Sequence, residues 1–199
     1  TEKSAPSFKA QLAGIQNNLM DPKDPSKFDK KNGIAYIDLL ATKYNIPVNA
    51  LQTLYKIESS QGQFLQGDYD AGAAKSVGGL QVWKGGAFAD YKQLINNDIS
   101  WNDFRTDHAL STEVGAWYYD RMLKAVKNWS KKFKWKLTNK IEIYDKDGEY
   151  FTTLKTGGIA PELVLAAMMY NGGPSTVDDE TGKVYLKRTA AEARAAKDV

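Results

Sequence analysis

The chain has 199 residues, of which 42% are hydrophobic and 12% aromatic, so it can bury one sizeable core and general disorder is excluded. Its formal charge of +3 is too weak a bias to indicate nucleic acid as a partner. Because it has no cysteine and a single histidine, disulfides, thiolate chemistry and a multi-histidine metal site are excluded, and we predict neither a metal nor a cofactor.

The first segment differs in composition from the rest of the chain. It holds three of the six prolines and one short apolar pattern, at Leu12, Ile15 and Leu19. We interpret residues 1–34 as an N-terminal arm with a short helix, and residues 35–199 as the main domain. No apolar run approaches the roughly 18 to 20 residues of a membrane span, and no signal peptide is recognisable, so we do not predict stable membrane insertion.

Helical periodicity predicts a pair of helices at the start of the main domain. Apolar residues recur every three or four positions from Tyr36 to Tyr44, and again from Val48 to Tyr55. The Asn-Ile-Pro sequence between them predicts a tight corner. Residues 62–86 follow, and their many glycines and their lack of a period predict a long ordered loop with at most short turns.

Two further helices are predicted in the second half of the chain. Periodic apolar residues between Leu110 and Ala125 predict the third helix. The segment PELVLAAMMYN predicts the fourth, with Pro161 suited to its first position. Because the fourth helix lacks a polar face, we expect it to be buried in the centre of the domain.

Between these two helices the pattern changes from helical to alternating. Phe133, Trp135 and Leu137 alternate with lysines, and DKDG then separates IEIY from EYFTTLK. This predicts a β-hairpin, and the alternation before it is compatible with a third strand. We therefore expect a mainly α protein of the α+β class, in which a helical domain carries a small β-hairpin insertion at about residues 131–158. The tail from Tyr185 onward is helical by propensity.

Glu58 stands where the second helix would place its next core residue. The apolar residues that precede it on this face are Val48, Leu51, Leu54 and Tyr55. A carboxyl on such a face is partly desolvated, which raises its pKa and suits a general acid near neutral pH. The helix should end in the following Ser-Ser-Gln-Gly, so Glu58 would face a loop. The alternative is a capping carboxylate or an ion pair with Lys56 or Lys75.

Three later stretches carry polar groups that suit sugar binding. In SVGGLQV, the paired glycines would let the backbone approach a ligand closely, and the amide of Gln81 could hydrogen-bond sugar hydroxyl or acetamido groups. The alternative is a glycine turn with a glutamine on the surface. MMYNGGPSTV ends the fourth helix and sets Tyr170 and Asn171 at the rim of the core, where an ordinary helix terminus is the alternative. ETGKVYLKR places Tyr185 early in the last helix, where its phenol could hydrogen-bond a carboxyl or simply pack.

Taken in order, IESSQG, SVGGLQV, LAAMMYNGGPSTV and ETGKVYL resemble four blocks of the lytic transglycosylase family, the soluble-transglycosylase domain related in fold to G-type lysozymes. Glu58 and Ser59 resemble its catalytic Glu-Ser pair, and the block that ends at Gln81 resembles its Gly-Leu-Met-Gln. The Tyr170-Asn171 pair resembles its Tyr-Asn pair, and Tyr185 its C-terminal tyrosine. The chain departs from this pattern where glycine replaces the expected Leu, in one extra residue before Tyr185, and in the β insertion.

The resemblance implies a lysozyme-like fold and cleavage of the β-1,4 bond between N-acetylmuramic acid and N-acetylglucosamine in peptidoglycan, with formation of 1,6-anhydromuramic ends. Glu58 would act first as acid and then as base. Ser59, Gln81, Tyr170, Asn171 and Tyr185 would bind the substrate. The implied partners are peptidoglycan glycan strands, and the implied place of action is the cell wall, reached from the periplasm, the outside or a phage virion. A phage or secretion-machinery origin, with assembly into that machinery, is favoured.

Two other functions remain open at this point. If Asp68 or Asp70 faced the same cleft as a second carboxylate and positioned a water, the protein would be a hydrolytic lysozyme. If the altered glycine block misplaced the substrate, it would be a non-catalytic peptidoglycan-binding module. The lysines and aromatic residues of KNWSKKFKWK predict either a surface that tunes glycan binding or a strand with one solvated, lysine-rich face.

Overall fold

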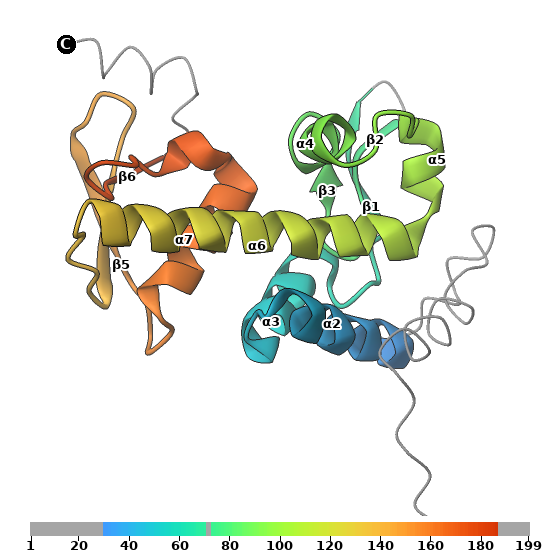
Figure 1. Cartoon of the computed structure of the whole chain (residues 1–199), viewed down its shortest axis with the longest axis horizontal. Helices are drawn as coiled ribbons and strands as arrows, with labels where there is room; N and C mark the ends of the chain where they lie inside the picture. The colour runs from blue at the N-terminus through green and yellow to red at the C-terminus, as the bar shows by residue number, and fades with distance from the viewer. Residues whose placement is uncertain (1–29, 71–72, 187–199) are drawn as a thin grey trace, which may run out of the picture. The chain divides into compact units, whose positions relative to one another are not determined.

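The computed structural model of this chain describes residues 30–70 and 73–186 (Figure 1). Of these residues 52% are helical and 16% are in strands, which confirms a mainly helical protein with small sheets. The chain divides into two compact units, Thr1–Trp117 and Tyr118–Val199, whose boundary falls inside one long helix. The predicted helices in the arm and in the C-terminal tail lie outside the described residues, and the division into one arm and one domain stays a prediction.

The first unit contains helices and one small sheet. Its elements are α2 (Lys30–Tyr44), α3 (Val48–Ser59), β1 (Gln66–Asp70), β2 (Ala73–Val77), β3 (Val82–Trp83), α4 (Ala87–Leu94), α5 (Trp101–Thr106) and the first part of α6 (His108–Lys132). Helix α2 already includes Lys30, so the predicted boundary at residue 34 cuts through it. Helices α4 and α5 have no counterpart in the sequence-based prediction.

The predicted helix pair is confirmed as α2 and α3. Most buried side chains of this pair belong to the apolar pattern: Tyr36, Ile37, Leu40, Ala41, Leu51, Leu54 and Tyr55, while Ser59 is buried in addition. Two residues of the pattern are not buried, since Tyr44 is half-buried and Val48 is 41% exposed at the start of α3. The amide Nε2 of Gln52 donates to Oδ1 of Asp38 at 2.6 Å and links the outer faces of the two helices.

The expectation of a loop over residues 62–86 is wrong, because β1, β2 and β3 form a three-stranded antiparallel sheet there. Gln66 pairs with Val77, and Ser76 pairs with Trp83. The strands have two to five residues, which is too short for an alternating apolar pattern to stand out among glycines and small residues. Pairing with a neighbouring strand, rather than local preference, orders this segment.

Aromatic rings join α4, α5 and α6 in the first unit. Phe88 packs against Trp101 and Phe104, with ring centroids 5.0 and 4.7 Å away. Tyr91 meets Trp117 edge to face at 5.7 Å. Such ring pairs add to the stability that burial alone provides. They explain why two short helices without a long periodic face are ordered.

The second unit consists of the rest of α6, a sheet and one further helix. Its elements are β4 (Lys140–Tyr144), β5 (Tyr150–Lys155), α7 (Pro161–Gly172), the 3-10 helix η2 (Pro174–Thr176) and β6 (Val184–Tyr185). The predicted hairpin is confirmed as β4 and β5, and the predicted third and fourth helices as α6 and α7. The hydroxyl of Tyr119 on α6 donates to the carbonyl of Leu163 on α7 at 3.0 Å.

Two expectations for this unit are corrected. The alternating segment around Trp135 forms no strand, and the third strand is β6, which pairs in parallel with β4 so that the sheet order is β5-β4-β6. Tyr185 therefore lies in a strand and not in a helix. A parallel partner so distant in the chain leaves no local pattern, which explains the error. Helix α7 buries Leu165, Ala166 and Met169, while most of its other side chains are only half-buried.

None of the helices within the described ranges is long and apolar enough to cross a membrane.

Candidate functional site

Glu58 lies in the last turn of α3, at the border of the buried face. Leu51, Tyr55 and Ser59, each four residues apart, form the buried line of the helix, while Ile57 is 69% exposed. The expectation that Glu58 continues the buried stripe is therefore corrected: Ser59 does so, and the Glu58 side chain is half-buried beside it. A carboxyl in this position is held by a rigid helix and remains accessible from one side.

Ser59 is buried and fully engaged within the protein. Its Oγ donates to the carbonyl oxygen of Gly79 at 2.6 Å, lies 3.1 Å from the carbonyl oxygen of Tyr55, and accepts from the backbone N–H of Gly62 at 2.9 Å. A substrate could contact this buried hydroxyl only by replacing one of these bonds, so the role of Ser59 in binding substrate stays a prediction. In the structure, Ser59 fixes the end of α3 against the turn at Gly78 and Gly79.

The glycine turn packs closely on the helices behind it. The N–H of Gly78 donates to the carbonyl of Leu65 at 2.9 Å, and the N–H of Gly79 donates to the hydroxyl of Thr112 at 2.9 Å. A Cβ on Gly79 would collide with the ring of Tyr55. Tyr55 thus fills the space that a larger side chain would need, which gives a physical reason for glycine where the resembled family has Leu. The glycines approach the protein itself rather than an open space.

Gln81 closes this turn and its amide is already hydrogen-bonded. Its Oε1 accepts from Ser76 Oγ at 2.9 Å, and its Nε2 donates to the carbonyls of Phe64 at 2.8 Å and Gly78 at 3.1 Å. The side chain is half-buried and links the segment before β1 to β2 and to the turn that follows β2. A ligand could use this amide only by replacing one of these bonds, so its role in binding sugar stays a prediction.

Strained backbone surrounds the link between Ser59 and the glycine turn. Ser60, Gln61 and Gln81 have φ values of 51°, 61° and 47°, a left-handed conformation that costs non-glycine residues of order 1–3 kcal/mol each. Strain of this kind persists only where neighbouring contacts enforce it, and it concentrates at functional sites. Its clustering on both sides of the hydrogen bond from Ser59 marks this region as a candidate site.

The remaining predicted residues lie in the second unit. Tyr170 is half-buried near the end of α7, and its ring centroid is 5.7 Å from that of Tyr118 on α6. Asn171 follows and is exposed, as the predicted helix stop requires. Tyr185 on β6 is half-buried with its ring centroid 6.1 Å from that of Tyr144 on β4.

The structure thus brings some of the predicted residues together and leaves others apart. In the first unit, Ser59 directly joins the helix end that carries Glu58 to the turn that ends at Gln81. In the second unit, the tyrosine and asparagine of α7 and the tyrosine of β6 belong to different elements. The backbone of Asp68 and Asp70 belongs to β1, and their side chains lie outside the described part of the chain.

A second acidic group of the first unit escaped the sequence-based reasoning. Glu113 on α6 lines a cavity of about 350 Å³, together with residues of α2 and α4 and with Ile95: Lys43, Tyr44, Tyr91, Ile95, Leu110, Val114 and Trp117. Its Oε1 is ion-paired with Lys43 and accepts from the hydroxyl of Tyr44 at 3.1 Å. Burial raises the pKa of Tyr91, and the charges of Glu113 and Asp107 raise it further. The cavity combines three distant segments, so no local motif indicates it.

Comparison of the chain with models of protein families, with curated proteins and with solved structures finds no match in any of the three.

Proposed function

We propose that this chain is a peptidoglycan lytic transglycosylase with a lysozyme-like fold, in which Glu58 is the catalytic acid and base. The observation that carries the proposal is the 2.6 Å hydrogen bond from Ser59 Oγ to the Gly79 carbonyl. It joins in space two of the four sequence blocks that resemble the family, and it holds a half-buried carboxyl at the end of a helix.

The reaction needs one carboxyl that acts twice. Protonated Glu58 gives its proton to the glycosidic oxygen as the bond to C1 of the muramyl sugar breaks, and the N-acetylglucosamine end leaves as an alcohol. The resulting carboxylate then accepts the proton of the sugar's own 6-hydroxyl while its oxygen bonds to C1. The ring closes as a 1,6-anhydro sugar, Glu58 is protonated again, and no water is consumed.

The resemblance gives Ser59, Gln81, Tyr170, Asn171 and Tyr185 contacts with the glycan. The hydrogen bonds of Ser59 support a second role for this residue, which is to position the helix end that carries the acid. The partner would be the glycan strands of the cell wall, reached from the periplasm, from outside the cell or from a phage virion. The weak excess of basic residues suits an anionic wall polymer. A phage or secretion-machinery setting is part of the same proposal.

Mass spectrometry of products from purified peptidoglycan tests the proposal. Wild type should release anhydromuramyl ends, and Glu58→Gln should release them at least about a hundredfold more slowly, because general acid catalysis contributes factors of this size. Glu113→Gln is the matched control, since it removes a helical, half-buried glutamate of the same unit. It should leave the products unchanged apart from a small loss of stability.

Other outcomes would replace the proposal with a defined alternative. Reducing ends instead of anhydro ends would show a hydrolase, and Asp68→Asn and Asp70→Asn would then locate its second carboxylate. Binding of the wall without any product would show a binding module. Loss of activity in Glu113→Gln but not in Glu58→Gln would move the acid to the cavity between α2 and α6.

A further inference from the structure

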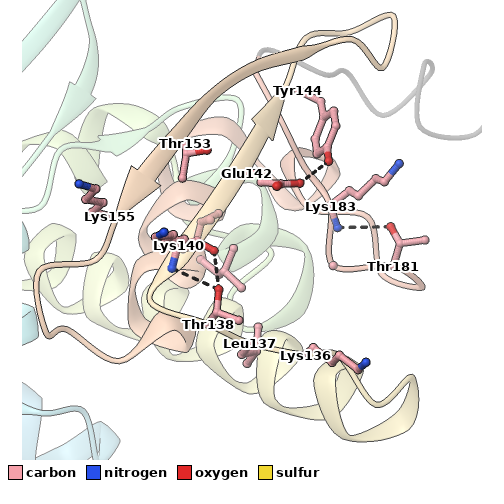
Figure 2. Close-up of a pocket in the computed structure, with 13 residues that line it drawn as sticks. Lys136, Leu137, Thr138, Lys140, Glu142, Tyr144, Thr153, Lys155, Thr181 and Lys183 are labelled. Carbon is pink, nitrogen blue, oxygen red and sulfur yellow. Dashed lines mark hydrogen bonds between the residues drawn. The ribbon is translucent and has the colours of Figure 1, made fainter.

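A cavity of about 750 Å³ lies in the second unit, and the proposed function assigns none of its lining residues a role (Figure 2). Its walls come from β4 and the segment that leads into it, from β5, from α7 and from the residues that lead into β6. Four of its lining residues are lysines, namely Lys136, Lys140, Lys155 and Lys183, and one is an acid, Glu142. This volume is in the range of small-ligand sites.

The lysines of this cavity carry unbalanced charge. Across residues 30–70 and 73–186, no carboxylate forms an ion pair with any of the four ammonium groups. Lys140 stands directly opposite Lys155 in the β4–β5 ladder, and like charges in this position are destabilising. An anion bound beside the ammonium groups of these two lysines would reduce their mutual repulsion. The cavity is therefore suited to a ligand with more than one negative group.

Glu142 restricts which anions fit. Its carboxylate accepts a hydrogen bond from the hydroxyl of Tyr144 at 2.6 Å, and Figure 2 shows this pair on the same face of β4 as Lys140. Lys183 lies over the Tyr144 ring, 4.9 Å from its centroid. A fixed carboxylate among lysines repels a pure polyanion such as a phosphate polymer or a nucleic acid, and attracts an ammonium group. The lining as a whole suits a ligand with several carboxylates and one amine.

One wall of the cavity is held in place before any ligand binds. The indole N–H of Trp135 donates to the carbonyl of Glu180 at 3.0 Å, and Oδ1 of Asp178 accepts from the backbone N–H and the hydroxyl of Thr181, both at 2.8 Å. A Cβ on Gly182 would come within 2.8 Å of the Trp135 ring, so the loop packs flat on it. Buried Ile141 and Leu165 add apolar surface to the lining. A preformed wall lowers the entropic cost of binding.

We propose that this cavity binds a short acidic peptide, holding its carboxylates with Lys136, Lys140, Lys155 and Lys183 and its amine with Glu142. The mixed aliphatic and charged lining fits a peptide better than a bare phosphate. If the proposed function holds, the natural ligand is the stem peptide that peptidoglycan strands carry, and this identification rests on that function. Binding here would keep the enzyme on the peptide-bearing part of its substrate.

Calorimetric titration of the full chain with N-acetyl-Ala-Glu-Lys-Ala, which carries carboxylates in excess over its single amine, tests the proposal. Binding should weaken at least about tenfold in the double variant Lys140→Gln/Lys155→Gln, because it removes two of the four ammonium groups that would hold the carboxylates. A tenfold loss of affinity corresponds to about 1.4 kcal/mol of binding free energy. Lys127→Gln is the matched control, because Lys127 is an exposed lysine of α6 outside the cavity. It should change the affinity less than about twofold.

Glu142→Gln separates a peptide site from a simple anion site. Glutamine can still accept from Tyr144, so the sheet should be preserved. The variant should bind the peptide several-fold more weakly, while its affinity for inorganic phosphate should rise. Tighter binding of the peptide by this variant, equal binding of N-acetyl-Ala-Gln-Lys-Ala amide, which keeps the lysine but has no carboxylate, stronger binding of an oligonucleotide, or no binding by wild type would each overturn the proposal.

The peptide contains no glycosidic bond, so its binding reports on the cavity alone. If the protein binds the peptide but releases no anhydro sugar, the cavity proposal stands and the proposed function is wrong. If the protein releases anhydro sugar but does not bind the peptide, the proposed function stands and the cavity proposal is wrong.

Discussion

The hydroxyl oxygen of Ser59 lies 2.6 Å from the carbonyl oxygen of Gly79, and through this contact the residue after Glu58 supports the turn that ends at Gln81. The same oxygen accepts from the N–H of Gly62, where the chain leaves α3. One buried hydroxyl therefore controls both the end of the helix and the path of the turn. Its removal should affect stability and the position of the candidate acid together.

Ser59→Ala should lower the free energy of unfolding by about 1–3 kcal/mol, because it leaves a buried N–H and carbonyl without their partner. Urea unfolding measures this loss. Thr53→Ala is the control: its hydroxyl, on the exposed side of the same helix, also bonds a helix carbonyl, and its loss should cost no more than about 0.5 kcal/mol. Equal effects of the two substitutions would contradict the role given to Ser59.

Gly79→Ala should destabilise the protein by about 1–3 kcal/mol, because the added methyl group meets the ring of Tyr55 in a packed region. Replacing Tyr55 by Leu in the same chain should relieve the collision. The double variant should then be less destabilised than the sum of the two single variants. Additive losses in thermal or urea unfolding would show that the ring does not determine the residue at position 79.

The pKa of His108 is lowered from its usual 6.5 because burial disfavours the charged ring, while Asp107 opposes the shift only partly. The folded state therefore keeps this histidine neutral and the unfolded state protonates it first. Its contribution to stability should be complete above about pH 6.5 and should be lost as the pH falls through the lower pKa of the folded state.

The single histidine makes this measurement direct, because one imidazole signal in a proton NMR titration reports its pKa. We expect a midpoint below 6.5, and a shallower loss of stability on acidification in His108→Gln than in wild type. A midpoint at or above 6.5 would contradict the effect of burial.

Lys155→Glu should stabilise the ligand-free chain by about 0.2–1 kcal/mol at low salt, because it converts the direct pair with Lys140 from repulsive to attractive. The gain should shrink as salt is added. Lys127→Glu changes the net charge equally but faces no cross-strand lysine. If both variants gain equally in urea unfolding, net charge rather than the strand pair is responsible.

Helices α2, α3 and α6 could be predicted from sequence because their apolar residues recur over several turns, whereas the short helices α4 and α5 were not predicted. Most of the residues expected to be buried on α2 and α3 are buried. Pro161 is the first residue of α7, a position that suits its fixed backbone angle. The sheet over residues 66–83 could not be predicted, since its strands are short and gain their order from one another. The pairing of β6 with β4 was missed for the same reason.

The sequence allowed the residue types of the candidate site to be predicted, but not how these residues are arranged in space. The chemistry of Glu58 and its place at a helix end follow from local pattern. Local pattern does not show whether Glu58 or Ser59 continues the buried face of α3, because the two positions are adjacent in the last turn of the helix. The amide of Gln81 could be identified as a polar group, whereas its three internal partners depend on the sheet that local pattern did not predict.

Because β6 joins β4 after β5 and α7 have intervened, the second unit has a defined order of assembly during synthesis. The β4–β5 hairpin has all its local contacts once residue 155 has left the ribosome, but the other edge of β4 stays open until Tyr185 emerges. Until then the chain displays an unpaired strand that carries Ile141 and Ile143. Open edges of this kind recruit other chains, so products that stop short of β6 should aggregate during expression.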